Sequence, residues 1–540
     1  MYKEDKLYVA HSTNGPISII GKMANRHGLI AGATGTGKTV SLQVLAETFS
    51  QAGVPCFMAD MKGDLSGISQ VGKMNGFIEK RCAEFGIESP QFAECPTRFF
   101  DVFGEQGYCM RTTVSAMGPQ LLSRLMELNE VQSGVLNVVF RIADDQNLLL
   151  IDLKDLRLML DFVGKNAANF TTSYGNISSA SIGAIQRALL AIESEGGDKF
   201  FGEPAFDVND LLDKVNGKGV MNVLAADKLM QNPKLYSTFL LWLLTELYTQ
   251  LPEVGDLPLP KLIFFFDEAH MLFEGTSKAL VDKIEQVIRL IRSKGVGIYF
   301  ITQSPTDVPV DILGQLGNRI QHALRAFTPK DQKDVRAAAQ TFRANPDFKT
   351  EDAIMELGTG EALVSFLDEK GAPSIVERAK ILFPLSSIGA ISDGQRLDVN
   401  NMAPSNIKAY DKFFDRESAY EVLNEHYEKA RKEAEIAEKE AAEEAEREAE
   451  EKEKAKKEKQ SGRNKSITRT IFGTMIGAVA TSFARSMGTQ VARNITKGST
   501  GSRSTSSKKK SSTTLNKAAK SATNAATRKI TNEILKGIFK

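Results

Sequence analysis

Eight consecutive residues, from Gly32 to Thr39, have the types and spacing that bind a phosphate chain. They read G-A-T-G-T-G-K-T and fit the pattern G-x-x-x-x-G-K-[ST] without substitution. Glycines let the backbone wrap around an anion, so that its N–H groups point at the α- and β-phosphates. We expect Lys38 to reach the β- and γ-phosphates and the Thr39 hydroxyl to bind Mg²⁺. The predicted nucleotide-binding residues are Gly32, Ala33, Thr34, Gly35, Thr36, Gly37, Lys38, Thr39 and Val40.

The residues on either side of this loop are those that should position it. The mostly apolar run from His27 to Ala31 suits a buried strand, and residues 40–46 continue as a helix whose N-terminus would face the phosphates. A Gly-rich turn that matches by chance would need neither flank. The sequence therefore predicts a nucleoside triphosphate site.

A second acidic motif lies far downstream. Residues 261–270 read K-L-I-F-F-F-D-E-A-H, an apolar run that ends in Asp267 and Glu268. Such a run is typical of a parallel strand buried on both faces, and ligands bind at the carboxyl ends of such strands. We expect Asp267 to hold Mg²⁺ through water and Glu268 to orient and deprotonate the attacking water. The alternative is a strand that ends in a solvated acidic turn.

Two further strands end in polar residues. The run from Gly295 to Ile301 is followed by Thr302 and Gln303, and Gln303 could contact the γ-phosphate or the attacking water. These two residues could also merely open a polar loop. The run from Val54 to Ala59 ends in Asp60-Met61-Lys62, so Asp60 and Lys62 are secondary site candidates or plain loop residues.

Charge is distributed unevenly along the 540 residues. Of 68 Lys and Arg and 67 Asp and Glu, residues 461–540 hold 16 basic residues and one acid, Glu533, which leaves 52 basic and 66 acidic residues before them. A basic tail on an acidic body suggests a contact with nucleic acid, a membrane surface or an acidic partner, or else a solvated tail without a partner. The four cysteines form no C-x-x-C pair and the N-terminus has no apolar signal segment, which favours a reducing cytoplasm over a zinc site or disulfides.

The pattern of the chain predicts six segments. Residues 1–25 are a β lead-in that contains a strand at Gly15–Ile20, and residues 361–366 and 374–382 could pair as a hairpin. A strand is also possible at residues 219–224. The predicted division is 1–25, then 26–111 as the first part of the core, 112–251 as a mostly helical insertion, 252–414 as the second part, 415–460 as a charged helix, and 461–540 as the tail.

The last two segments differ in character. Residues 419–459 are rich in Glu, Lys and Ala, which predicts a helix that is either a solvated spacer or a weak coiled coil. Residues 467–495 and 530–539 are amphipathic and could bind a membrane surface, dock on the body or assemble subunits. The apolar stretch 470–484 is too short to span a bilayer, so we expect no integral membrane span.

Taken in order, these motifs resemble one superfamily. H-G-L-I-A-G-A-T-G-T-G-K-T, M-A-D-M-K-G-D-L-S-G, I-F-F-F-D-E-A-H and I-T-Q-S-P together resemble the HerA/FtsK superfamily of P-loop motor ATPases, and look closest to its bacterial YjgR-like branch. The resemblance covers roughly residues 10–400. It implies an α/β fold with a RecA-like P-loop core, ATP and Mg²⁺ as cofactors, a homo-oligomeric ring that is usually a hexamer, and translocation on double-stranded DNA.

The resemblance also implies an arginine that completes a neighbouring subunit's site. Arg319, in G-N-R-I, is the position that matches, and Arg325 is the second choice. One feature departs from the pattern: HerA proteins have an N-terminal β-barrel before the phosphate loop, whereas here the loop begins at Gly32.

Three functions compete on these residues. The leading hypothesis is a cytoplasmic ATPase that acts on DNA as a helicase or translocase. The second is a P-loop ATPase that moves or remodels a protein partner, and the third is a nucleotide-dependent scaffold that binds through its basic tail. The presence of Glu268 disfavours the scaffold, because a pure switch can dispense with a catalytic acid.

Overall fold

One large mixed sheet organises the residues that this computed structural model describes, which are 2–3, 6–273 and 278–460. Its strands lie in the order β1-β2-β15-β14-β13-β4-β12-β11-β5-β10-β6-β7, with β3 beside β2. Neighbouring strands from β13 to β7 are parallel, whereas β14, β15 and β2 add antiparallel at one end. The strands are β1 (Tyr2–Lys3), β2 (Lys6–Ser12), β3 (Gly15–Ile20), β4 (Gly28–Ala31), β5 (Cys56–Asp60), β6 (Thr97–Asp101), β7 (Tyr108–Cys109), β10 (Met221–Ala225), β11 (Leu262–Phe266), β12 (Val296–Thr302), β13 (Asn318–Gln321), β14 (Glu361–Ser365) and β15 (Glu377–Ile381), and a separate small pair is β8 (Lys214–Val215) with β9 (Lys218–Gly219).

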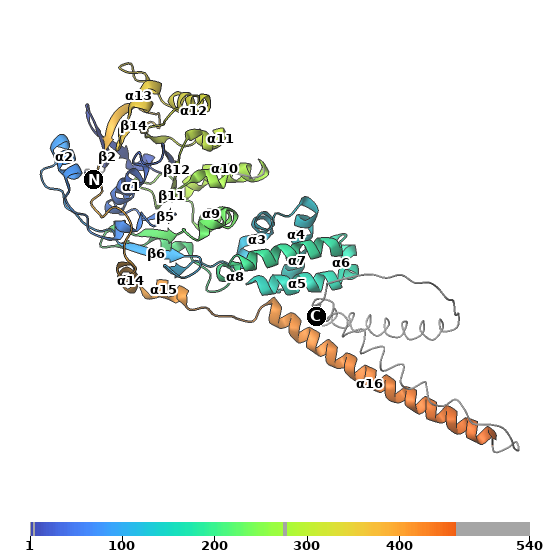
Figure 1. The fold of residues 1–540 in the computed structure, drawn as a ribbon. Coiled ribbons are helices and arrows are strands. Elements are labelled where there is room, and N and C mark those ends of the chain that lie inside the picture. Colours follow the sequence, from blue (N-terminus) through green and yellow to red (C-terminus); the bar gives the residue numbers. More distant parts are fainter. Residues whose placement is uncertain (1, 4–5, 274–277, 461–540) are drawn as a thin grey trace, which may run out of the picture. The chain divides into compact units, whose positions relative to one another are not determined.

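Helices connect and cover these strands, and α3 to α7 gather into one bundle beside the sheet (Figure 1). The helices are α1 (Lys38–Gln51), α2 (Gly76–Phe85), α3 (Val114–Leu125), α4 (Glu130–Asp145), α5 (Leu153–Lys165), α6 (Ala167–Tyr174), α7 (Ser179–Ser194), α8 (Gly197–Phe200), α9 (Pro233–Gln250), α10 (Lys278–Ile291), α11 (Val310–Leu313), α12 (Pro329–Gln340), α13 (Thr350–Glu356), α14 (Asp393–Asn401), α15 (Ser405–Lys408) and α16 (Ala419–Gln460).

The bundle lies within the predicted helical insertion, but that segment also returns to the sheet. Strand β10, at the position where the sequence allowed a strand, lies between β5 and β6 and all five of its residues are buried. Its one polar side chain, Asn222, donates through its amide nitrogen to the carbonyl oxygens of Cys56 at 3.2 Å and Leu211 at 3.1 Å. Segment 112–251 therefore supplies a central strand as well as the bundle.

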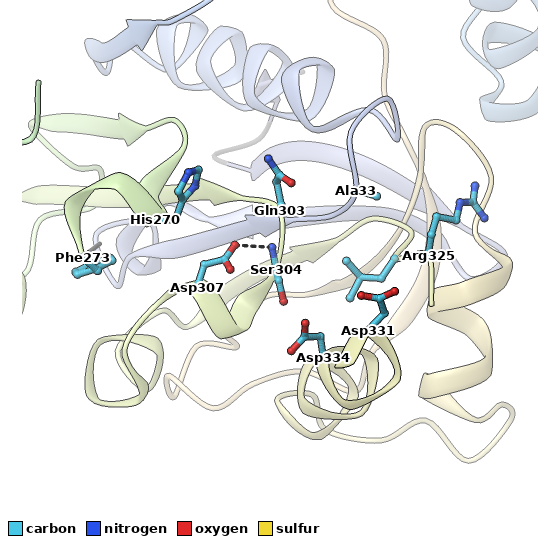
Figure 2. Close-up of a pocket in the computed structure, with 10 residues that line it drawn as sticks. Ala33, His270, Phe273, Gln303, Ser304, Asp307, Arg325, Asp331 and Asp334 are labelled. Carbon is cyan, nitrogen blue, oxygen red and sulfur yellow. Dashed lines mark hydrogen bonds between the residues drawn. The ribbon is translucent and has the colours of Figure 1, made fainter. Parts of the chain in front are cut away.

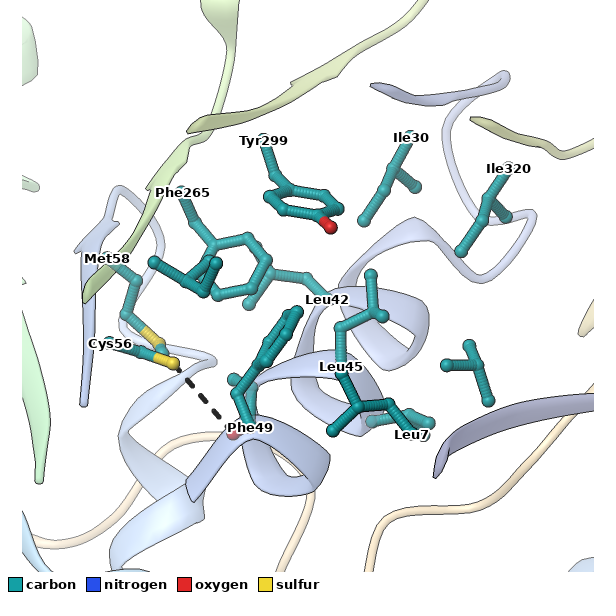
Figure 3. Packing of buried hydrophobic residues seen from close by; sticks show 14 of the residues in the cluster. Leu7, Ile30, Leu42, Leu45, Phe49, Cys56, Met58, Phe265, Tyr299 and Ile320 are labelled. Carbon is teal, nitrogen blue, oxygen red and sulfur yellow. Dashed lines mark hydrogen bonds between the residues drawn. The ribbon is translucent and has the colours of Figure 1, made fainter. Parts of the chain in front are cut away.

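The helix that follows the phosphate loop is fixed by the core beneath it. Helix α1 buries nearly all its middle residues, and Leu42, Leu45 and Phe49 pack on side chains from the parallel strands (Figure 3). The Phe49 and Tyr299 rings meet edge to face with centroids 5.9 Å apart. The core therefore anchors the helix whose first turn carries Lys38.

The remaining elements agree with the patterns that predicted them. Strands β14 and β15 form the expected antiparallel hairpin, and α16 forms the expected charged helix. Its side chains from 432 to 454 are exposed, and i,i+4 ion pairs such as Lys452–Glu448 lie along it. The compact body is Met1–Val422, which ends later than the predicted limit near Phe414. The basic tail, 461–540, lies outside the described residues, and among those described no helix is long and apolar enough to cross a membrane.

Candidate functional site

The predicted site residues follow strands that end at the same edge of the sheet. Strand β12 lies between β4 and β11, and its Thr302 pairs with Ala31 while its Phe300 pairs with Phe266. Because these strands are parallel and in register, the phosphate loop, Gln303 and Asp267 all emerge together.

The loop from Gly32 to Gly37 needs glycine at both ends. Gly32 and Gly37 have φ angles of 155° and 114°, where residues with a side chain are strained. A Cβ on Gly32 would also lie 2.5 Å from the His322 Cβ, and one on Gly37 would lie 3.3 Å from the Gly360 backbone nitrogen. The motif glycines are therefore required by local conformation and by close packing as well as by room for phosphate.

Lys38 lies over this loop. Its ammonium donates to the carbonyl oxygens of Gly32 at 2.6 Å and Ala33 at 3.2 Å. Burial lowers the pKa of Lys38, while Glu268 and Asp267 act in the opposite direction. Both carboxylates are thus close enough to Lys38 to act on it electrostatically, which places the lysine near the loop and the acidic strand together.

His322 packs against the phosphate loop, and no sequence motif indicated this histidine. It is fully buried just after β13; its Nδ1 lies 2.9 Å from the Glu361 carbonyl oxygen and its Nε2 lies 2.8 Å from the Ser41 Oγ. A carbonyl only accepts, so Nδ1 carries the proton and Nε2 accepts from Ser41. Burial lowers the pKa of His322 to about 4, and Lys38 acts in the same direction. A neutral imidazole therefore joins α1 to β14 next to the loop's first glycine.

Asp267 is a half-buried carboxyl beside a second acid. Its Oδ1 accepts the Glu268 N–H at 2.9 Å, and its backbone oxygen accepts from the Tyr236 hydroxyl at 3.2 Å. Burial and the nearby Glu268 raise the pKa of Asp267 to about 7. A carboxylate held in this way is a strong site for a cation.

Glu268 occupies a strained backbone position. Its φ of 46° and ψ of 50° are left-handed, a conformation that costs energy for a residue with a side chain and is common at functional sites. The side chain is 15% exposed, with Oε1 3.7 Å from the Lys62 Nζ and Oε2 3.5 Å from the His270 Nδ1. The carboxylate of Glu268 therefore lies between two side chains that can carry positive charge.

Gln303 and Thr302, adjacent in sequence, have different roles. Thr302 is buried and donates to Asp307 Oδ2 at 2.6 Å, so its hydroxyl is bonded to the turn that follows its strand. Gln303 is exposed and lines a pocket of about 610 Å³ that also includes Ala33, His270 and Arg325 (Figure 2). Of the two residues, Gln303 alone has a side chain that faces open space next to the loop.

Asp60 and Lys62 also lie at this edge. Asp60 is buried; its Oδ2 accepts the Leu65 N–H at 3.2 Å, and its Oδ1 has no hydrogen-bond partner within the described chain. Burial and the neighbouring Asp64 raise the pKa of Asp60 to about 6. Lys62 reaches Glu268, so it contacts the site directly, whereas Asp60 shapes the turn that carries it.

The two candidate arginines lie in different places. Arg319 donates to the backbone oxygens of Leu316 at 2.9 Å, Thr341 at 2.7 Å and Leu313 at 2.9 Å, so its guanidinium braces its own chain. Arg325 is exposed and lines the pocket next to the phosphate loop. The role of Arg319 in a neighbouring subunit stays a prediction, and Arg325 is the freer of the two.

The donors at this edge fit Mg²⁺ bound together with a nucleotide. No group of three or more His, Cys, Asp or Glu side chains converges as a metal site in the described ranges. Mg²⁺ prefers one or two protein oxygens supplemented by water and phosphate oxygens. Thr39, at the start of α1, and the half-buried Asp267 would supply those protein ligands.

Comparisons with known proteins agree with the superfamily that the motifs resemble. The family model described as "Helicase HerA-like C-terminal" matches residues 5–510. A search of curated protein sequences returned no match. Similar solved structures include the bacterial conjugative coupling protein TrwBdeltaN70, at 14% identity, with 72% of this chain and 92% of that chain covered and a TM-score of 0.49. VirB4 of Thermoanaerobacter pseudethanolicus is also 14% identical, with 71% and 97% covered and a TM-score of 0.45.

The family match covers most of the chain and includes every site residue described above. The observed sheet confirms the predicted α/β fold with a P-loop core, because the phosphate loop joins a central parallel strand to the helix that follows it. The chain belongs to the helicase HerA-like C-terminal family and is a P-loop motor ATPase of that type.

Proposed function

We propose that this protein hydrolyses ATP to move along double-stranded DNA. One observation carries the proposal: the phosphate loop, Lys38, Gln303, Asp267 and Glu268 meet at one sheet edge, with both carboxylates acting on Lys38. A phosphate grip, a cation ligand and a base for water are the components that phosphoryl transfer requires.

Each of these residues has a distinct task in the proposal. The loop N–H groups and Lys38 bind the phosphates, and Lys38 exchanges its bonds to the loop carbonyl oxygens for phosphate oxygens. Thr39 and Asp267 hold Mg²⁺, which neutralises charge that develops on the phosphate oxygens. Glu268 accepts a proton from the attacking water, and Gln303 contacts the γ-phosphate or that water.

We infer a homo-oligomeric ring, a hexamer by family resemblance. The pocket beside the loop is open and contains Gln303 and Arg325, so a neighbouring subunit could reach the reacting phosphate there (Figure 2). An arginine from that subunit, Arg319 or Arg325, would stabilise charge in the transition state. Hydrolysis would then depend on assembly.

The proposed compartment is the cytoplasm, and the proposed substrate is DNA rather than protein. All four cysteines, Cys56, Cys82, Cys95 and Cys109, are buried free thiols, which suits a reducing compartment. Membership of the helicase HerA-like C-terminal family supports the proposal of DNA as substrate. The basic tail, 461–540, is a further candidate contact for DNA, an acidic partner or a membrane surface.

The test is the rate of ATP hydrolysis with and without double-stranded DNA, using Lys38→Ala as the blank. We expect DNA to stimulate hydrolysis at low salt and less so as salt rises, because phosphate contacts release counterions. Removing residues 461–540 tests whether the tail carries that response. A rate of ATP hydrolysis that does not change with DNA would contradict the DNA proposal and favour a protein partner as the substrate.

A further inference from the structure

A second pocket, of about 500 Å³, contains four arginines. It lies at the amino ends of β4, β12 and β13, the edge opposite to the phosphate loop. Arg26 precedes β4, Arg289 lies on α10, Arg292 lies just before β12, and Arg319 lies in β13. Although these residues are far apart in sequence, the parallel strands bring them around one hollow.

Little negative charge balances this group. None of the residues that line the pocket is Asp or Glu. The guanidinium groups of Arg26 and Arg292 have no hydrogen bond or ion pair with any part of the chain that the structure describes. Arg289 has one distant partner, Glu285, whose Oε1 lies 3.9 Å away. Clustered guanidinium groups repel one another, and a bound anion would relieve that repulsion.

An acidic residue in the connection between β14 and β15 already accepts hydrogen bonds from its own turn. Gly371, in the turn between β14 and β15, lines the pocket, and a Cβ on it would lie 3.8 Å from the Arg26 Nη1. Asp368 of that turn accepts the backbone N–H groups of Lys370 and Ala372, both at 2.9 Å. Its Oδ1 therefore stabilises the turn, and the residues of this connection that line the pocket, Leu367, Gly371 and Pro373, are uncharged.

The remaining wall is rigid and open. Arg319 is fixed by its three carbonyl bonds, and His27 beneath it accepts the Ile298 N–H at 3.0 Å through Nδ1. Gly314 and Gly317 border the hollow without side chains. An anion can therefore approach the free guanidinium groups of Arg26 and Arg292 closely.

We propose that this arginine pocket binds a phosphate group, with Arg26 and Arg292 as the principal contacts. Guanidinium groups match phosphate oxygens in geometry and remain charged at every physiological pH. The expected source is the backbone of DNA, a point that rests on the proposed function; a soluble phosphate compound has the same chemistry. Because the pocket lies at the opposite edge from Lys38, its occupant is not the ATP that is hydrolysed.

The test compares DNA binding by the intact chain with that of Arg26→Gln/Arg292→Gln, by fluorescence anisotropy across a salt series. The control, Arg187→Gln/Arg336→Gln, removes the same charge from exposed positions elsewhere. Losing two phosphate contacts should weaken binding about 10-fold or more at low salt and flatten the salt slope by about 2. Melting temperatures of all variants show that each is folded.

A second arm separates the two sources of phosphate. Pyrophosphate binding is measured by calorimetry in a Lys38→Ala background, with and without the Arg26→Gln/Arg292→Gln changes. Weaker DNA binding supports a backbone contact, whereas loss of pyrophosphate heat alone supports a soluble ligand. If the pocket variant matches the control in DNA binding, and the pocket changes leave the pyrophosphate heat of Lys38→Ala unchanged, the proposal is overturned. A wild-type protein that binds no DNA refutes the proposed DNA function, and the pyrophosphate arm still decides the pocket.

Discussion

The raised pKa of Asp267 leads us to expect a pH-dependent change in the free energy of unfolding, which can be measured without an activity assay. Without metal or nucleotide, Asp267→Asn should stabilise the protein, and more so at high pH. The folded-state pKa is about 7 against an ordinary 3.8, so the folded protein retains this proton over a range in which the unfolded chain has lost it. The stability that the neutral carboxyl provides is present below pH 3.8 and is lost as pH rises to about 7.

The size of this effect follows from the shift. At about 1.4 kcal/mol per pH unit, the wild type has lost about 1.6 kcal/mol of this stability by about pH 5 and about 4 kcal/mol by about pH 8. The advantage of Asp267→Asn should therefore grow by about 2–3 kcal/mol between those pH values. For a body of this size, that corresponds to a rise of about 2–3 °C in melting temperature.

The assay is thermal unfolding in a chelator at a series of pH values, for wild type, Asp267→Asn and the exposed control Asp398→Asn. Asp60, whose pKa is also raised, to about 6, titrates in all three proteins and cancels in the comparison. Added Mg²⁺ and ATP should stabilise the wild type but not Asp267→Asn. A melting difference that is the same at about pH 5 and about pH 8 would refute the reasoning from burial.

Three further substitutions test the remaining parts of the site. Glu268→Gln should retain ATP binding but slow hydrolysis by about 10²–10³-fold, because the base for water is lost; single-turnover kinetics would contradict this by showing an unchanged rate. His322→Leu should weaken nucleotide binding measured by a fluorescent ATP analogue, and cost about 2–4 kcal/mol of stability, because Ser41 loses its partner; unchanged nucleotide affinity would reduce His322 to a packing residue. Arg325→Ala, at an exposed position, should lower hydrolysis with little change in melting temperature, whereas Arg319→Ala should lower the melting temperature itself; the opposite pattern would identify Arg319 as the arginine that acts in the neighbouring subunit.

Local spacing alone predicts the residues that we expect to contact phosphate. The loop from Gly32 to Thr39 works through its own backbone, so its pattern is complete in eight residues. Asp267 and Glu268 follow an apolar strand directly, and the parallel-sheet rule places them at the ligand edge. The hairpin of β14 and β15 and the helix α16 were likewise predictable, because alternation and composition define them within a few dozen residues.

Contacts between distant segments could not be predicted in this way. Nothing in the sequence shows that β12 separates β4 from β11, or that β10 returns to the sheet after the helical bundle. The brace from His322 to Ser41 depends on β13 lying beside β4, across more than half of the body. Strand pairing therefore brings to the phosphate loop a histidine that has no motif around it.

The sequence by itself determined the class of chemistry that we expect of this protein. The tertiary structure decided where the side chains lie and how their pKa values are shifted. The phosphate loop and the two adjacent acids can be recognised from residue types at short spacing, because each motif acts through neighbouring backbone and side-chain atoms. The raised pKa of Asp267 depends on burial under other elements, and the arginine pocket depends on four residues that meet only when the strands pair. Burial and charge proximity are properties of the folded chain, because they arise between segments that no linear pattern relates.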